Sequence, residues 1–172
     1  MCGIIGTYRG NTEIIKDVIS LLRHRGPDDN GFFLDSSSGI ALGHQRLSII
    51  DTSPLGHQPM ISNDGQVVIV FNGEIYNFQS IRENLVKDDC KFLGNSDTEV
   101  LLNLYLSEGK AMLSKLNGIF AFAIWDHRSK LLFVARDALG VKPLYYFLGD
   151  SIFSFSSEIK ALLEFIPQDK EL

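Results

Sequence analysis

The sequence predicts one domain of the α+β class, a sandwich of mainly antiparallel sheets with helices packed against them. Strand-like runs occur in adjacent pairs joined by short turns, and segments with helical spacing fall between these pairs, which is the pattern of such folds. The 172 residues can bury one core but are too few for two ordinary domains. A content of 45% hydrophobic and 22% charged residues is typical of a globular protein.

The N-terminal half alternates strand and helix patterns. Residues 2–8 are apolar and rich in glycine, which indicates an inner strand with a crowded neighbour. Residues 12–23 carry apolar side chains at helical spacing. Residues 31–35 and 40–50 have strand-like patterns. Residues 67–71 are continuously apolar and β-branched, as in a strand that is covered on both faces.

Two helix starts precede a C-terminal third made of strand pairs. The apolar spacing after Asn77 predicts a helix capped by that asparagine, and Ser96-Asp97-Thr98-Glu99 is a capping-box pattern ahead of a second helix. Strand pairs are expected at 118–125 with 130–136 and at 143–148 with 151–156, followed by a short helix over 158–165.

Charge and hydropathy argue against several classes of function. The 16 basic and 21 acidic residues give a net charge of −5, whereas proteins that bind nucleic-acid backbones need a basic surface. The longest apolar block, residues 119–125, is far shorter than the ~18 residues of a membrane-spanning helix. No secretory signal precedes Arg9, and two cysteines do not form a disulfide framework. We therefore expect a cytoplasmic protein that binds neither nucleic acid nor membrane.

Metal chemistry is not expected either. The four histidines show no pair at metal-ligand spacing and no clustered carboxylates around them. A glycine loop that would cradle a phosphate is also missing from the pattern.

Cys2 is the first candidate for catalysis. Methionine before a small residue is normally removed, which would leave a thiol and a free α-amine on one residue. Their reference pKa values, ~8.5 and ~7.7–8.0, make proton transfer between them nearly thermoneutral. Cys2 could thus supply both a nucleophile and a general base. Its position alone, however, favours a small buried strand residue with a structural role. Cys90, which has no neighbouring base, is interpreted as structural.

The segment Phe71-Asn72-Gly73-Glu74 is a candidate oxyanion site. An asparagine amide and an unhindered glycine N–H, at the end of a buried strand, can donate to the same oxygen. Asn-Gly between apolar runs is also the usual signal of a hairpin turn. The sequence favours neither of these two interpretations over the other.

Two charged residues suit the ends of a free amino acid. Arg46, within a strand-like stretch, can bind a carboxylate through two hydrogen bonds, although an exposed strand arginine is more common. Asp97, next to the cap Ser96, could receive an ammonium group, but the helix dipole also favours an acidic residue in a first helical turn.

Together these segments resemble the class II glutamine amidotransferase domain, and most closely its asparagine synthetase branch. The similarity runs from Met1 to about Leu163, and its motifs occur in the family's order. The matching segments are Met1-Cys2-Gly3-Ile4-Ile5-Gly6, His24-Arg25-Gly26-Pro27-Asp28, Arg46-Leu47-Ser48-Ile49-Ile50, Asn72-Gly73-Glu74-Ile75-Tyr76-Asn77, Ser96-Asp97-Thr98-Glu99, Arg136-Asp137 with Gly140-Val141-Lys142-Pro143-Leu144-Tyr145-Tyr146, and Ser157-Glu158-Ile159-Lys160-Ala161-Leu162.

This resemblance implies a four-layer αββα sandwich of the N-terminal-nucleophile hydrolase type, in which two antiparallel sheets lie between helices. The implied reaction is hydrolysis of glutamine to glutamate and ammonia through a thioester on Cys2, with the α-amine as base. By the family's motifs, Asn72 and Gly73 would form the oxyanion hole. The implied substrate-binding residues are Arg46 for the carboxylate, Glu74 and Asp97 for the ammonium side, and Leu47, Ser48, Ile49 and Ile50 as pocket lining.

Family members continue into an ATP-using synthetase domain. We therefore expect residues 1–172 to be the glutaminase domain of a longer asparagine-synthetase-like chain, or else a separate subunit that passes ammonia to a partner. No cofactor is expected in this domain, and ATP and magnesium only in the synthetase domain. The expected partners are L-glutamine and that synthetase domain, and the resemblance also allows a homodimer. A chain that retains Met1 is expected to be inactive.

Two other functions stay open. A non-catalytic regulatory module would bind glutamine without releasing ammonia. A hydrolase of a different amide is less favoured, because Arg46 and Asp97 provide for both charges of a free amino acid.

Overall fold

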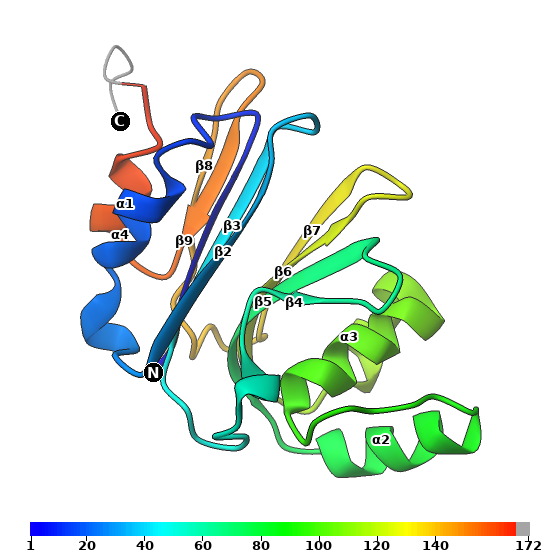
Figure 1. The fold of residues 1–172 in the computed structure, drawn as a ribbon. Coiled ribbons are helices and arrows are strands. Elements are labelled where there is room, and N and C mark those ends of the chain that lie inside the picture. Colours follow the sequence, from blue (N-terminus) through cyan, green and yellow to red (C-terminus); the bar gives the residue numbers. More distant parts are fainter. Residues whose placement is uncertain (168–172) are drawn as a thin grey trace.

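Two antiparallel β-sheets lie face to face in this protein, and helices cover the outer face of each (Figure 1). The structure is a computed structural model, and it describes residues 1–167. The order of layers is helices, sheet, sheet, helices. The α+β class and the four-layer arrangement expected from the sequence are therefore confirmed.

The first sheet has five strands in the order β2-β3-β1-β9-β8. Their bounds are β1 (Gly3–Tyr8), β2 (Asp29–Asp35), β3 (Ile40–Arg46), β8 (Tyr145–Leu148) and β9 (Phe153–Ser156). The helices on its outer face are α1 (Ile15–Ser20) and α4 (Ile159–Leu163).

The second sheet has four strands in the order β4-β5-β6-β7. Their bounds are β4 (Met60–Ile61), β5 (Val67–Ile75), β6 (Gly118–Asp126) and β7 (Leu131–Arg136). The helices on its outer face are α2 (Phe78–Lys87) and α3 (Asp97–Glu108). Short 3-10 segments occur at Arg23–Arg25, Pro54–Gly56 and Gly109–Lys115.

Three apolar cores hold the four layers together. One lies between the two sheets and contains Leu42, Val68, Val70 and Phe155. The other two lie between each sheet and its own helices. In β5, alternate residues face the inter-sheet core and the helix core, so both faces of this strand are buried, as its continuous apolar run predicts.

β1 is the inner strand that the sequence predicts. It pairs with β3 on one side and β9 on the other. The predicted crowding beside this strand is confirmed, because a Cβ placed on Gly6 would lie 2.6 Å from the ring of Phe155 and 2.8 Å from Leu42. Glycine at this position therefore permits close packing in the inter-sheet core.

Two elements are shorter than the sequence predicts. The helix expected over 12–23 is regular only from Ile15 to Ser20, because the following N–H groups bond three residues back instead of four. The strand expected over 40–50 ends at Arg46, and 47–50 form a loop. β3 has no further strand partner beyond this point among the described residues, because Arg46 pairs with Asp29, the first residue of β2.

The turn interpretation of Asn72-Gly73 is wrong. Both residues lie inside β5, which continues to Ile75 and pairs with β6 along its whole length. Asn77 precedes α2 as predicted, but its side chain does not cap the helix. Instead it donates to the carbonyl of Lys115 at 2.8 Å and accepts from the N–H of Asn117 at 3.0 Å.

The remaining helix and strand predictions are confirmed with small shifts of boundary. The strand pairs of the C-terminal third are β6 with β7 and β8 with β9. The two-residue strand β4 has no counterpart in the predictions. No helix among the described residues is long and apolar enough to cross a membrane.

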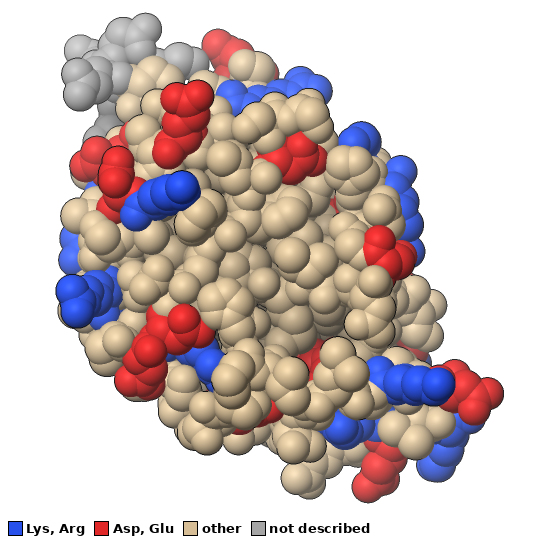
Figure 2. Space-filling view, in the orientation of Figure 1, with Lys and Arg blue, Asp and Glu red and all other residues tan. Residues whose placement is uncertain are grey.

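Charged side chains on the face shown in Figure 2 are spread around its rim, with acidic and basic residues side by side and an uncharged centre. This face carries no continuous basic surface of the kind that a nucleic-acid backbone would need.

Candidate active site

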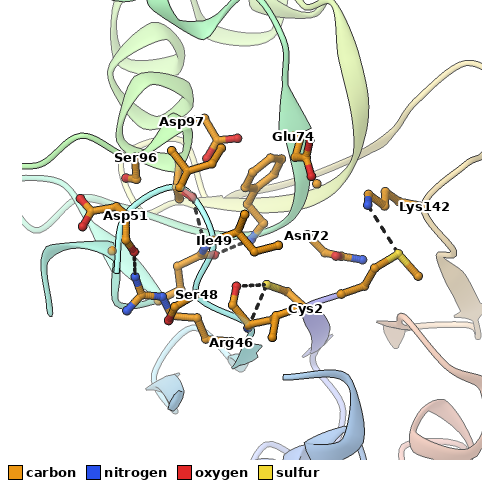
Figure 3. Close-up of a pocket in the computed structure, with 18 residues that line it drawn as sticks. Cys2, Arg46, Ser48, Ile49, Asp51, Asn72, Glu74, Ser96, Asp97 and Lys142 are labelled. Carbon is orange, nitrogen blue, oxygen red and sulfur yellow. Dashed lines mark hydrogen bonds between the residues drawn. The ribbon is translucent and has the colours of Figure 1, made fainter. Parts of the chain in front are cut away.

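All ten residues singled out from the sequence line one pocket, at the place where β1 begins, β3 ends and α3 begins (Figure 3). The empty space at the pocket, including open solvent at its mouth, is about 620 Å³. The ten are Cys2, Arg46, Leu47, Ser48, Ile49, Ile50, Asn72, Gly73, Glu74 and Asp97. The other lining residues were not predicted as site residues. Five of them, Met1, Phe71, Ser96, Thr98 and Lys142, lie in segments quoted above, whereas no sequence pattern pointed to Asp51, Gly56 and Gln58.

Cys2 lies directly before β1, with its thiol against the backbone of Leu47. The N–H of Leu47 donates to Sγ at 3.3 Å, and Sγ lies 3.5 Å from the carbonyl oxygen of the same residue. Burial raises the pKa of the Cys2 thiol, and the Leu47 N–H, the chain-terminal ammonium, Arg46 and Lys142 offset this only in part. Because the thiol therefore stays protonated at neutral pH, attack on a substrate needs a base that removes its proton.

The backbone around Cys2 is held by two further contacts. Arg25 donates from Nε to the carbonyl of Cys2 at 3.0 Å and from Nη1 to Glu158 at 3.2 Å. At the next-but-one residue, the N–H of Ile4 donates to the hydroxyl of Ser157 at 3.0 Å. These contacts tie the start of β1 to the chain before α4 and orient the thiol toward the pocket.

The pocket is possible because β4 is only two residues long. β4 pairs with Val68 and Ile69, so within residues 1–167 the later part of β5 has no strand on that side. The N–H of Phe71 is taken by Gln58 at 2.7 Å, and that of Ile75 by Asp97 at 3.2 Å. Gly73 lies between these two residues, and the alternation of a strand places its N–H at the same edge, facing the pocket.

Asn72 is almost completely buried, and its Nδ2 has no hydrogen-bond partner among the described residues. A buried donor without a partner is costly, so such a group is typical of a site that a ligand completes. Gly73 has no room for a side chain, because a Cβ there would overlap the backbone of Ile119 and Phe120 in β6. One amide donor without a partner and one glycine N–H at an unpaired strand edge thus occupy neighbouring positions.

Arg46 is buried, so the interpretation as an exposed strand arginine is wrong. Its guanidinium donates to the carbonyls of Asp51 and, at 3.2 Å, of Ser53. Nη1 also lies 3.8 Å from the carboxylate of Asp29. Arg46 therefore closes the loop after β3 onto the pocket and brings a positive charge to its wall.

Asp97 and Glu74 supply negative charge to the pocket. Asp97 is buried at the first turn of α3, where it accepts from the N–H of Ile75. Burial raises its pKa to about 6, helped by the nearby charge of Glu74 and opposed by hydrogen bonds from backbone N–H groups. A positively charged ligand group beside Asp97 would favour the ionised carboxylate.

Lys142 lies on the other side of Cys2 from Arg46 in Figure 3 and is also buried. Its ammonium contacts the sulfur of Met1 at 3.5 Å. The loop that carries it is shaped by Asp137, whose carboxylate accepts from the N–H groups of Val141 at 2.8 Å and Lys142 at 3.0 Å. Within residues 1–167, no group of three or more histidine, cysteine or acidic side chains is arranged to hold a metal ion.

Comparison with known proteins assigns the chain to a family. The glutamine amidotransferase domain family matches residues 1–172. Asparagine synthetase 1 (glutamine-hydrolyzing) of Bacillus subtilis is 42% identical over 95% of the chain and 27% of its own length. Amidase chry2 of Gibberella zeae is 40% identical over 93% of the chain and 24% of its own length. The chain thus spans about a quarter of the length of these two relatives.

A solved structure shows the same fold. Glutamine phosphoribosylpyrophosphate amidotransferase from B. subtilis, complexed with ADP and GMP, superposes with a TM-score of 0.76 at 24% identity. The match covers 93% of this chain and 42% of that one.

Proposed function

The chain belongs to the glutamine amidotransferase domain family, and from that premise we propose that it hydrolyses L-glutamine to glutamate and ammonia, with Cys2 as the nucleophile. The observation that carries the proposal is one pocket in which the Cys2 thiol lies with the unpartnered amide of Asn72 and charges of both signs. A free amino acid with a side-chain carboxamide has groups that match each of these features.

The base in this proposal is the α-amine of Cys2 after removal of Met1. The amine takes the thiol proton, and the thiolate attacks the carboxamide carbon to give a tetrahedral intermediate. Asn72 and the N–H of Gly73 donate to the oxygen that becomes negative, and each such donor is typically worth about 2.7–4 kcal/mol. The amine then returns the proton to the leaving nitrogen, ammonia departs, and a γ-glutamyl thioester remains.

Water completes the cycle. The amine takes a proton from water, the hydroxide attacks the thioester, and glutamate leaves as the thiol is restored. During both steps Arg46 would bind the α-carboxylate, while Asp97 and Glu74 would bind the α-ammonium. The loop residues Leu47, Ser48, Ile49 and Ile50 would form the wall around the substrate.

For the larger protein, we propose that residues 1–172 form the glutaminase part of an asparagine-synthetase-like enzyme in the cytoplasm. The asparagine synthetase relative, of which the chain covers 27%, supports this proposal. Ammonia would pass to an ATP-dependent synthetase domain, and ATP and magnesium would bind there rather than in the pocket described above. Assembly as a homodimer is compatible with this proposal.

Replacement of the nucleophile tests the proposal. In a preparation whose mass confirms that Cys2 is the first residue, Cys2→Ala should abolish glutamate formation from glutamine. Alanine is smaller than cysteine, and position 2 lies outside the strand ladder. The circular dichroism spectrum and the melting temperature should therefore stay close to those of the unsubstituted protein. Cys90→Ala is the matched control, because Cys90 lies outside the pocket.

The same experiment separates the alternatives. A protein that starts at Cys2, binds glutamine and releases no ammonia would be a regulatory module, and the catalytic proposal would then be wrong. Normal turnover by Cys2→Ala would remove the thiol from the mechanism.

A further inference from the structure

Gln58 is a pocket residue to which no sequence pattern pointed. It is almost completely buried and lies in the loop between β3 and β4. Its Oε1 accepts from the N–H of Phe71 at 2.7 Å, and its Nε2 donates to the hydroxyl of Thr98 at 3.1 Å. The orientation of the amide is defined, because a backbone N–H can only donate.

The carbonyl of Phe71 is held from the opposite sheet. His44, a fully buried residue of β3, places Nε2 at 3.0 Å from this oxygen. Nε2 must carry the proton, since a carbonyl only accepts. Burial lowers the pKa of His44 to about 3, so the ring stays neutral at physiological pH.

Both polar backbone atoms of Phe71 are thus satisfied by side chains that come from outside its own sheet. These contacts replace the strand partner that is missing beyond the end of β4. Phe71 directly precedes Asn72 and lies two residues before Gly73. A tilt of the peptide plane at Phe71 would therefore change the direction of the donors at both following positions.

We propose that Gln58 is a positioning residue for amide hydrolysis. Its role is to act through Phe71: Gln58 holds the N–H of this residue and His44 holds its carbonyl, so that Asn72 and the N–H of Gly73 meet the developing oxyanion. This inference rests on the proposed glutaminase function. It predicts that Gln58 matters more for the transition state than for the bound substrate.

The main test is Gln58→Met, which keeps the length of the side chain and removes both hydrogen bonds. With Cys2 confirmed as the first residue, kcat for glutamine should fall about ten- to a hundredfold, because misplacement by about 1 Å can cost that much. KM should change little, since Arg46, Glu74 and Asp97 are untouched. Gln66→Met is the matched control, because Gln66 lies in a surface turn outside the pocket.

An aldehyde analogue provides a readout that general destabilisation would not move. Glutamate γ-semialdehyde adds to a thiol to form a tetrahedral adduct whose oxygen occupies the oxyanion site, whereas glutamate only fills the pocket. In Gln58→Met the inhibition constant of the aldehyde should rise in parallel with the loss of kcat. The dissociation constant of glutamate should stay the same.

Thr98 keeps the proposal testable if Gln58→Met does not fold. Thr98→Val keeps the shape of the side chain but leaves Nε2 of Gln58 without an acceptor, so kcat should fall by a smaller factor. Thr98→Ser, which retains the hydroxyl, should recover most of that loss. The double variant with Gln58→Met should be no slower than Gln58→Met alone, because both changes break the same contact.

The outcomes separate this inference from the function on which it rests. If the unsubstituted protein produces no glutamate, the proposed function fails first. If it is active and Gln58→Met keeps its kcat and aldehyde affinity, Gln58 has no positioning role. A rise in KM alone would also overturn the inference, because it would place Gln58 in substrate binding.

Discussion

Cys2 shows how one residue depends on several distant ones. Its thiol contacts Leu47, and its carbonyl accepts from Arg25, so segments from three parts of the chain define its position. Burial keeps the thiol protonated despite the surrounding cations. The reactive form is therefore made only when a base is present, and the free α-amine is the base that the proposed reaction requires.

Arg46 combines two tasks that need the same cation. Its guanidinium binds carbonyls of the loop that carries Asp51 and Ser53, and it also lines the pocket. A guanidinium has five N–H donors, so carbonyl contacts leave others for a carboxylate. In the proposed reaction, substrate binding and loop closure would therefore be coupled at this residue.

The raised pKa of Asp97 predicts that a fall in pH weakens substrate binding but increases the stability of the folded protein. Its pKa is raised from 3.8 to about 6 in the folded protein. Only the ionised carboxylate attracts an ammonium group, so KM for glutamine should rise as the pH falls below about 6. The stability linked to this group is fully present below about pH 4 and is lost as the pH rises through 6, because the folded state holds the proton more tightly.

Steady-state kinetics between pH 5 and 8, with denaturant titrations at the same pH values, check this prediction. Asp97→Asn should give a high KM at every pH and remove the inflection near 6. An unchanged KM profile in Asp97→Asn would show that another group binds the ammonium.

At the scale of elements, α3 connects helix capping to the site. The hydroxyl of Ser96 accepts from the N–H of Glu99 at 3.2 Å, as a capping box predicts. The carboxylate of Glu99 does not return to Ser96; it accepts from Leu93 at 2.7 Å and Gly94 at 2.8 Å. The box is thus half formed, and Glu99 instead orders the loop before the helix.

Ser96→Ala should lower the free energy of unfolding by about 1 kcal/mol, the usual loss for an N-cap. Because Asp97 is the first residue of α3, fraying of this turn should also raise KM for glutamine. Urea titrations and steady-state kinetics measure the two effects. Ser114→Ala is the control, since its hydroxyl lies in an exposed 3-10 segment outside the pocket, and an equal effect there would refute the capping argument.

At the scale of the whole molecule, the two sheets hold different halves of the site. The first sheet carries Cys2 and Arg46, and the second carries Asn72 and Gly73. The distance between the proposed nucleophile and the proposed oxyanion donors is therefore set by the packing between the two sheets, which is as dense as in other protein interiors.

Two Leu→Ala variants, one in each of two cores, test whether packing between the sheets positions the two parts of the site. Leu42 lies between the sheets, whereas Leu104 lies between the second sheet and its helices, and both are buried. Each Leu→Ala change should destabilise the protein by about 2–5 kcal/mol. Leu42→Ala should in addition lower kcat for glutamine, and Leu104→Ala should not. Calorimetry and kinetics below the melting temperature of both variants measure this, and equal kcat losses would contradict the division.

Local patterns were sufficient for most elements and for the membership of the site. Paired strands, the cap at Ser96 and the covered strand β5 follow from periodicity and turn chemistry, which act over a few residues. Of the ten pocket residues, Cys2, Arg46, Asn72, Gly73 and Asp97 were predicted from their own chemistry. The other five followed from the resemblance to the family's motifs. Gln58 lacked such a signal, because a glutamine in a loop has no distinctive pattern. Thr98 and Lys142 lie within matching motifs, but nothing in the sequence assigned either of them a role in the site.

Chain order alone could establish which chemical groups are available: a thiol at the second position, an amide beside a glycine, and charges of both signs. Their convergence depended on contacts between residues far apart in the chain. β3 ends where its partners end, β4 stops after two residues, and the edge of β5 is thereby left open at Gly73. Strand pairing joins residues that are far apart in the chain. The unpaired edge of β5 and the pocket beside it are therefore defined only once the sheets have formed.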